Sequence, residues 1–230
     1  MTKNVLQNMN LAFVGAGAMG AAMIGGLLAR KEVQPNQITA SDRHEDRLEI
    51  MVNQFRVETT LDNRLAAQKA QLIVLAVKPQ VLPAVIEELN GVVQKDALVI
   101  SIVAGTTINS IAKGLKHRAI VRTMPNTPAQ VGEGMTVWTA TREVSQLQRA
   151  QAGAILAALG KELFVEEERF LDMATAISGS GPAYIFLMME ALIDAAVHLG
   201  FSREDARELV LQTIRGSAIY AQKQPVHPAE

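Results

Sequence analysis

The sequence predicts an α/β protein in which a doubly wound, mostly parallel sheet is followed by an all-helical domain. Two observations predict this class. Short apolar runs that suit buried strands alternate with helix-like runs through the first 165 residues, as in a sheet with helical crossovers. After that point the pattern becomes helical throughout. We therefore expect two domains, at residues 1–165 and 166–230.

The expected elements follow in chain order. Strands are predicted at residues 11–15, 37–41, 72–77, 98–103, 119–123 and 135–139. Helices are predicted at residues 19–30, 43–53, 83–89 and 108–115, and in the second domain at 170–177, 182–199 and 203–222. The runs at 72–77 and 98–103 are continuously apolar, which is typical of strands buried on both faces. Residues 1–9 suggest a polar leader, and residues 166–169 (Glu-Glu-Glu-Arg) a charged hinge.

Composition excludes several classes of function. Hydrophobic residues make up 49% of the 230 residues and the net charge is -1, which suits a packed globular protein with no nucleic-acid partner. Cysteine is absent and the four histidines show no ligand spacing, so we expect no metal. The apolar run at 11–28 is interrupted by turn-like glycines and has no preceding basic segment. We therefore expect neither signal peptide nor membrane span, and a cytoplasmic location.

The helix expected at 182–199 is apolar around most of its circumference. A helix with that pattern is buried on several sides. A small helical domain offers too little surface to cover it. We therefore expect it to pack against a partner subunit.

A glycine turn lies between the first predicted strand and the first predicted helix. Gly15, Gly17 and Gly20 match G-x-G-x-x-G. Gly15 permits a tight turn, Gly17 lets the backbone approach a pyrophosphate, and Gly20 lets the helix lie close to the sheet. The phosphates would sit at the helix N-terminus, where free N–H groups favour anions. The pattern predicts a dinucleotide site on a Rossmann domain; the alternative is a purely structural turn.

The end of the second strand bears on which dinucleotide binds. Asp42 lies where an acid would bind the ribose hydroxyls of NAD, whereas Arg43 could pair with the 2′-phosphate of NADP. We favour NADPH, with Asp42 capping the next helix and Arg43 reaching the phosphate. NADH stays open, as does a solvated Asp-Arg pair with no ligand.

Three further segments end strands at the edge where an open parallel sheet binds ligands. Lys78 follows a buried strand and could hold an anionic group, or be an ordinary surface lysine. The small residues Ala104 and Gly105 would let nicotinamide or ribose lie against the backbone, or would form a plain turn with Thr106 or Thr107 as N-cap. Two prolines fix the loop around Asn126 and Thr127, which suits orienting a substrate, or a structural turn.

The helical half contains a fourth candidate, Ser-Gly-Ser-Gly-Pro-Ala-Tyr at 178–184. Pro182 suits the first turn of a helix and Ser180 is a candidate N-cap. The turn would present hydroxyls and free N–H groups, which could cradle a carboxylate. A simple helix start is the alternative. The substrate-binding candidates are Ser178, Gly179, Ser180 and Gly181, and the catalytic candidates are Lys78, Asn126 and Thr127.

Taken together, these motifs resemble those of the pyrroline-5-carboxylate reductases. The similar segments are Phe-Val-Gly-Ala-Gly-Ala-Met-Gly at 13–20, Ala-Val-Lys-Pro at 76–79, Met-Pro-Asn-Thr-Pro at 124–128 and Ile-Ser-Gly-Ser-Gly-Pro-Ala-Tyr at 177–184. Their order and spacing match along nearly the whole chain. The resemblance implies reduction of L-1-pyrroline-5-carboxylate to L-proline with NADPH or NADH. It also implies a Rossmann domain, a helical domain that dimerises by interleaving, and assembly of dimers into a decamer.

The resemblance also implies a set of cofactor contacts, which includes Asn63, a position that spacing alone does not single out. The contacts are Gly15, Ala16, Gly17, Ala18, Met19, Gly20, Ser41, Asp42, Arg43, Asn63, Ala76, Val77, Lys78, Pro79, Val103, Ala104 and Gly105.

The sequence departs from the family pattern at its C-terminal end. In the family, a segment like His-Pro-Ala-Glu at 227–230 leads into a helix and a loop that supplies substrate contacts and a threonine proposed as proton donor. The sequence ends at Glu230, so we expect an incomplete substrate side. One alternative function is therefore a dinucleotide-binding protein that associates through its helices without turnover. Another is a hydroxyacid dehydrogenase relative, but residues 170–215 contain no lysine to act as its catalytic residue.

Overall fold

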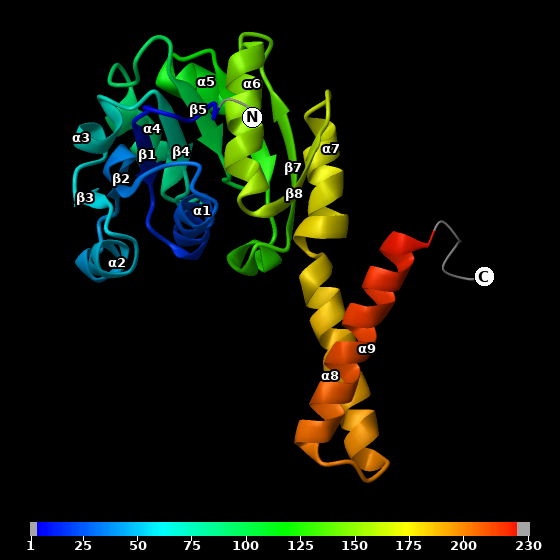
Figure 1. Cartoon of the computed structure of the whole chain (residues 1–230). Helices are drawn as coiled ribbons and strands as arrows, with labels where there is room; N and C mark the ends of the chain where they lie inside the picture. The colour runs from blue at the N-terminus through cyan, green and yellow to red at the C-terminus, as the bar shows by residue number, and fades with distance from the viewer. Residues whose placement is uncertain (1–3, 225–230) are drawn as a thin grey trace. The chain divides into compact units, whose positions relative to one another are not determined.

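A computed structural model describes residues 4–224 and confirms the predicted fold class (Figure 1). By contacts it divides into two compact units, residues 1–179 and 180–230. The division predicted at residue 165 stays a prediction. The segment 227–230 lies outside the described residues.

The first unit is built on one eight-stranded sheet with strand order β3-β2-β1-β4-β5-β6-β7-β8. The strands are β1 (Leu11–Val14), β2 (Ile38–Ser41), β3 (Glu58–Thr60), β4 (Leu72–Leu75), β5 (Leu98–Ser101), β6 (Ile120–Met124), β7 (Gly134–Ala140) and β8 (Gly160–Phe164). All neighbouring pairs are parallel except β6 and β7. The first six strands therefore have the Rossmann order, with the reversal between β1 and β4.

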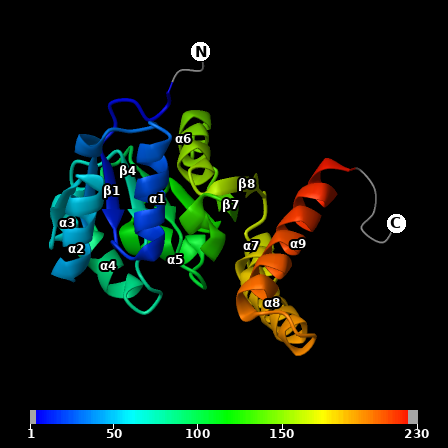
Figure 2. The same ribbon diagram turned by 60° about the horizontal axis from the view of Figure 1, so that its bottom comes forward.

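Alternate residues of the central strands face two separate apolar cores. Leu11 and Phe13 of β1 pack with α1 (Ala18–Ala29), α2 (Glu45–Ile50) and α6 (Gln146–Ala157). Ala12 and Val14 pack with α3 (Asn63–Ala67), α4 (Leu82–Leu89) and α5 (Ile108–Leu115) on the other side. A strand buried on both faces has apolar residues at every position, which explains the uninterrupted runs. Figure 2 shows these helices around the sheet from a second direction.

Several predicted elements have different ends or a different character. The strands expected at 72–77 and 98–103 end earlier, at Leu75 and Ser101. The helix expected at 43–53 is α2 followed by the π-turn Met51–Phe55. Residues 4–9 are not a leader: Leu6 is fully buried, and the Asn4 amide donates to the Glu32 carbonyl oxygen at 2.7 Å.

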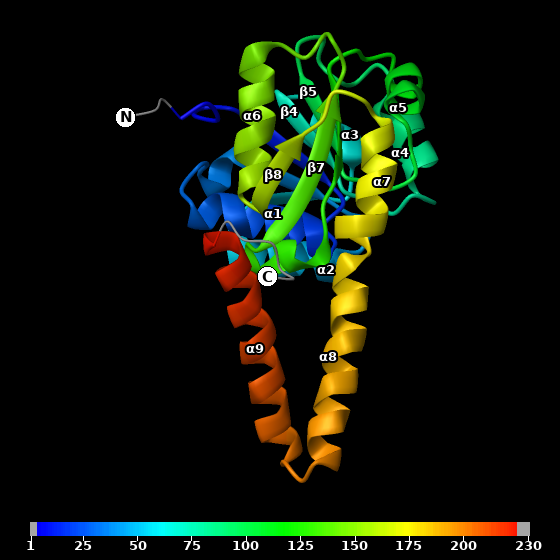
Figure 3. The same ribbon diagram turned by 90° about the vertical axis from the view of Figure 1, so that its right-hand side faces the viewer.

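The remaining helices are α7 (Arg169–Ala174), which continues into the π-turn η4 (Thr175–Gly179), and the hairpin of α8 (Gly181–His198) and α9 (Arg203–Lys223) (Figure 3). The hairpin buries little of its own apolar surface. No residue of α8 is buried, and only Ala206 and Val210 of α9 are. By length and composition alone, Arg169–His198 is also apolar enough to cross a membrane. This surface therefore needs a covering layer.

Candidate cofactor and active site

An open cleft of about 790 Å³ lies at the carboxyl ends of β1, β2, β4 and β5. This is the edge at which a doubly wound sheet binds ligands, next to the point where the strand order reverses. Most of the predicted cofactor contacts line it. They are Gly15, Gly17, Ala18, Met19, Ser41, Asp42, Arg43, Asn63, Ala76, Val77, Lys78, Pro79, Val103 and Ala104.

The three glycines of the turn have the different roles that the motif predicts. Gly15 has φ +108°, and a Cβ there would lie 2.6 Å from the Ala76 carbonyl oxygen. A Cβ on Gly20 would lie 2.4 Å from the Gly15 carbonyl oxygen. A Cβ on Gly17, by contrast, would meet nothing within 4 Å. Gly15 and Gly20 thus allow close packing within the protein, whereas Gly17 leaves free space beside the cleft.

The N-terminus of α1 faces this space without a side-chain cap. Gly17 is the N-cap residue and offers no side-chain acceptor to the first turn. The first N–H groups of a helix have no intrahelical acceptor, and together with the helix dipole they favour an anion. The turn therefore fits a phosphate group, as the sequence predicts. Ala16 and Gly20 support the turn but do not line the cleft.

Asp42 is turned inward and does not cap α2, so that expectation was wrong. The N-cap of α2 is His44. Asp42 is 8% exposed, and its oxygens accept the backbone N–H groups of Ala16 at 2.9 Å and His44 at 3.1 Å. Arg47 also approaches it, at 3.4 Å. Asp42 therefore fixes the glycine turn to the loop after β2, which leaves its oxygens less available to ribose.

Cations gather at this end of the cleft. Arg43 is exposed and lines the cleft together with Arg47 and Arg64. Arg47 and Arg64 were missed from the sequence, although the spacing of four residues between Arg43 and Arg47 places them near each other at the start of a helix. Guanidinium groups suit the 2′-phosphate that distinguishes NADP from NAD. The residues present therefore fit NADPH.

Asn63 is held by hydrogen bonds at both ends of its amide. Its oxygen accepts from the Ser41 hydroxyl at 2.8 Å, and its nitrogen donates to the Glu88 carboxylate at 2.6 Å. Both Ser41 and Asn63 line the cleft, so these bonds set the shape of its wall. After the turn that follows β5, Thr107 is the N-cap of α5, which confirms one of the two caps expected there. Gly105 (φ +73°) belongs to this turn but does not line the cleft.

The predicted catalytic residues do not meet in one cleft. Lys78 is exposed at the cleft edge, and no carboxylate of residues 4–224 pairs with it. Asn126 lies elsewhere in the first unit: its amide nitrogen donates to the Ser178 carbonyl oxygen at 3.0 Å, and its oxygen accepts the Met135 N–H at 2.9 Å. Thr127 is exposed at the start of a 3₁₀ helix, Thr127–Val131. Asn126 thus holds the segment that carries Ser178.

The predicted substrate turn contains part of a π-turn. Ser178 and Gly179 end η4, and the Ser178 hydroxyl donates to the Ala174 carbonyl oxygen at 3.1 Å. A Cβ on Gly179 would lie 2.8 Å from the Met124 side chain, so this turn packs closely on the end of β6. In the second unit, Ser180 occupies the N-cap position of α8 without a side-chain cap bond, and Pro182 lies in the first turn as expected. Single π-turns within helices are frequent at functional sites.

Comparison with known proteins decides the family. A curated pyrroline-5-carboxylate reductase from Synechocystis is 41% identical over 97% of this chain and 83% of its own length. The chain belongs to the pyrroline-5-carboxylate reductase family. Residues 168–230 match the model of the pyrroline-5-carboxylate reductase dimerisation domain, and residues 10–105 match that of NADP oxidoreductase, coenzyme F420-dependent.

Solved structures of family members agree over nearly the whole chain. The pyrroline-5-carboxylate reductase of Coxiella burnetii superposes with a TM-score of 0.91 at 39% identity, covering 97% of this chain and 83% of that one. The Plasmodium falciparum enzyme, solved with NADP bound, gives a TM-score of 0.87 at 31% identity and covers 97% and 82%. The resemblance inferred from the motifs is confirmed.

Proposed function

We propose that this protein reduces the C=N bond of L-1-pyrroline-5-carboxylate to give L-proline, the last step of proline biosynthesis. A hydride is added to the imine carbon and a proton to the nitrogen. The observation that carries the proposal is the cleft beside Gly17, with its uncapped helix N-terminus and its cations, in a chain of this family. NADPH supplies the hydride when bound, and NADH is the alternative donor.

Different residues of the cleft hold different parts of the cofactor. The first turn of α1 binds the pyrophosphate through backbone N–H groups beside Gly17. Arg43 pairs with the 2′-phosphate, and Arg47 stands one turn further along. Ala104 presents only a small side chain to the cleft, so its wall admits a flat ring or a ribose against the backbone. Lys78 holds an anionic group at the mouth.

On the substrate side, we assign the carboxylate of the imine to the turn Ser178–Gly181. Asn126 supports this turn, because its amide nitrogen donates to the Ser178 carbonyl oxygen. Thr127 follows Asn126 and offers an exposed hydroxyl. Orientation of two well-placed partners can supply about 7–11 kcal/mol of barrier reduction. A site of this kind needs no strong internal base.

The exposed helices account for assembly. A homodimer would cover α8, none of whose residues is buried in the described chain. The match of residues 168–230 to a dimerisation domain favours a second copy as the covering layer. We also propose that the dimers assemble into a decamer and that the protein is cytoplasmic. Nucleic acid and membrane are not among the proposed partners.

The test measures the oxidation of NADPH by the purified chain with pyrroline-5-carboxylate. A parallel assay measures the reduction of NADP with a panel of short hydroxy acids. We expect turnover with the imine and none with the hydroxy acids. Turnover only with hydroxy acids would contradict the proposal and favour a dehydrogenase. Tight NADPH binding without turnover of either would favour the dinucleotide-binding alternative.

A further inference from the structure

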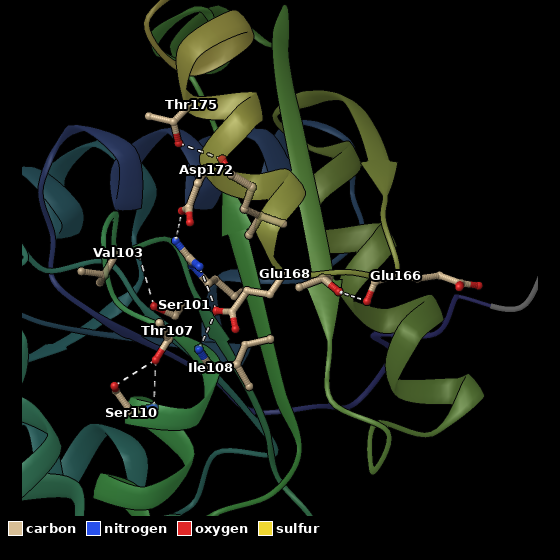
Figure 4. A network of polar contacts seen from close by, with 12 residues as sticks. Ser101, Val103, Thr107, Ile108, Ser110, Glu166, Glu168, Asp172 and Thr175 are labelled. Carbon is tan, nitrogen blue, oxygen red and sulfur yellow. Dashed lines mark hydrogen bonds and ion pairs between the residues drawn. The ribbon is translucent and has the colours of Figure 1, made fainter.

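One buried cation of the first unit takes no part in the roles assigned above. Arg122, on β6, has a side chain that is 6% exposed. Its guanidinium pairs with the Glu168 carboxylate at 2.8 Å and with the Asp172 carboxylate at 3.0 Å. Glu168 is the N-cap residue of α7 and Asp172 lies one turn further along; Figure 4 labels both, and a dashed line joins each carboxylate to the guanidinium. The start of α7 is thus attached to the middle of a sheet strand.

Glu168 also reaches the wall of the cofactor cleft. The oxygen that pairs with Arg122 accepts the backbone N–H of Ile108 at 2.7 Å. Ile108 begins α5 and follows the turn after β5, whose residues Val103 and Ala104 line the cleft. The Ser101 hydroxyl accepts the Val103 N–H at 3.3 Å within the same turn (Figure 4). One carboxylate oxygen therefore joins the start of α7 to the start of α5, four residues after Ala104 of the cleft wall.

At its other end, α7 leads to the predicted substrate turn. It continues through η4 to Ser178, whose carbonyl oxygen accepts from Asn126, just beyond β6. Arg122 and Asn126 therefore fix α7 and η4 to β6 at both ends. The contact of Arg122 with Glu168 lies on the side of the cofactor cleft, and that of Asn126 with Ser178 on the side of the substrate turn.

Stability of the fold is a poor explanation for the ion pairs of Arg122. Burying the Arg122 guanidinium carries a desolvation cost, whereas the side chains of its partners Glu168 and Asp172 are 31% and 73% exposed. A charged pair does fix a geometry, because a guanidinium and a carboxylate bond only in a few orientations. The neighbouring pair of Arg169 and Glu167 offers a contrast, since both of its side chains are more than half exposed.

We propose that Glu168, held by Arg122, is a positioning residue for hydride transfer. It fixes the turn Val103–Gly105 relative to the segment that ends at Ser178, and so sets the distance between the cofactor and the imine. This inference rests on the proposed function. It assigns no contact between Glu168 and either reactant.

The test compares Glu168→Ala with Glu168→Gln and with the control Glu167→Gln. The control makes the same chemical change one residue away, in an exposed pair. We expect Glu168→Ala to lower kcat by about tenfold or more, with little change in the KM for NADPH, because misplacement of reactants acts on the chemical step. Glu168→Gln should fall between it and the parent, since the amide oxygen can still accept from Ile108. Glu167→Gln should behave as the parent.

A second measurement does not depend on turnover. Amide hydrogen exchange should become faster in peptides covering residues 102–110 and 169–179 of Glu168→Ala, and stay unchanged in Glu167→Gln. Faster exchange with unchanged kcat would mean that the pair is structural only, and would overturn the proposal. Unchanged exchange, or a rise in the KM for NADPH at constant kcat, would also overturn it.

If Glu168→Ala does not fold, the kcat of Glu168→Gln is compared with that of Glu167→Gln. A lower kcat for Glu168→Gln supports the proposal, and equal kcat values overturn it. If the parent binds NADPH but never reduces the imine, the proposed function fails. The exchange measurement still decides in that case whether Glu168 fixes the cleft wall.

Discussion

The two units of the chain differ in how far they bury their apolar residues. In the first unit every residue of β1, β4 and β5 is buried, and the sheet has a core on each face. In the second unit the 18 residues of α8 include none that is buried. The first unit therefore completes its own core and carries its own cofactor cleft. The second leaves its apolar surface exposed, which agrees with its match to a dimerisation domain.

The largest expected effect is on that assembly. In the double variant Phe186→Asp/Leu187→Asp, two exposed apolar side chains of α8 become charged. We expect the dimer dissociation constant to rise by about a hundredfold or more, because the loss of a hot-spot residue at the centre of an interface costs about 2 kcal/mol or more. Sedimentation equilibrium measures the mass.

The control for the double variant is Leu147→Asp, whose leucine on α6 of the first unit is similarly exposed. It should leave the mass unchanged. A double variant with the parent's mass would mean that α8 is not the interface.

A smaller effect is expected at the cofactor cleft. Gly17→Val adds a side chain where the present backbone leaves free space, so the fold should persist while NADPH affinity falls by about tenfold or more through lost pyrophosphate contact. NADPH fluorescence titration gives the affinity, and thermal unfolding checks the fold. Gly153→Val, also in open space but on α6, is the matched control. Unchanged NADPH affinity in Gly17→Val would remove the turn from the cofactor site.

Gly15→Ala separates packing from binding within the same turn. Its φ of +108° and the close Ala76 carbonyl group predict a loss of stability of more than about 1 kcal/mol. Denaturant unfolding measures this loss. A Gly15→Ala chain as stable as the parent would contradict the packing role of Gly15.

The smallest effect concerns the choice between cofactors. Arg43→Ala should weaken NADPH by several-fold and leave NADH nearly unchanged, because only NADPH carries the 2′-phosphate that a guanidinium pairs with. Titration with each cofactor gives the ratio. Arg142→Ala, an exposed arginine outside the cleft, should alter neither affinity. Equal losses for the two cofactors would show that Arg43 does not distinguish them.

The sequence predicted the parts of the fold in which one local pattern dominates. The buried strands and the glycine turn have such patterns, and they were found where expected. Elements at the edges were missed: β3 is Glu-Thr-Thr, and most of β8 is exposed, so neither shows an apolar period. The helix α6 was also missed, although Ser145 and Gln148 form a capping box that the sequence displays.

The site was predictable where a strand end marks it, and less so where distant residues meet. Lys78 follows one strand and the glycine turn follows another, and Lys78 lines the cleft together with Gly15, Gly17, Ala18 and Met19. Asp42 occupied the expected position, but its orientation depends on the Ala16 N–H, 26 residues away. The link between Arg122 and Glu168 spans 46 residues, and no local pattern indicates it.

The most direct test of the account is the fate of the transferred hydrogen. The chain would be incubated with pyrroline-5-carboxylate and NADPH that carries deuterium at both C4 positions of the nicotinamide, and the product analysed by mass spectrometry and NMR. We predict L-proline with one deuterium at the former imine carbon, formed by the parent and lost with Gly17→Val. Oxidation of NADPH without labelled proline, or labelled proline at the parent's rate from Gly17→Val, would contradict the account.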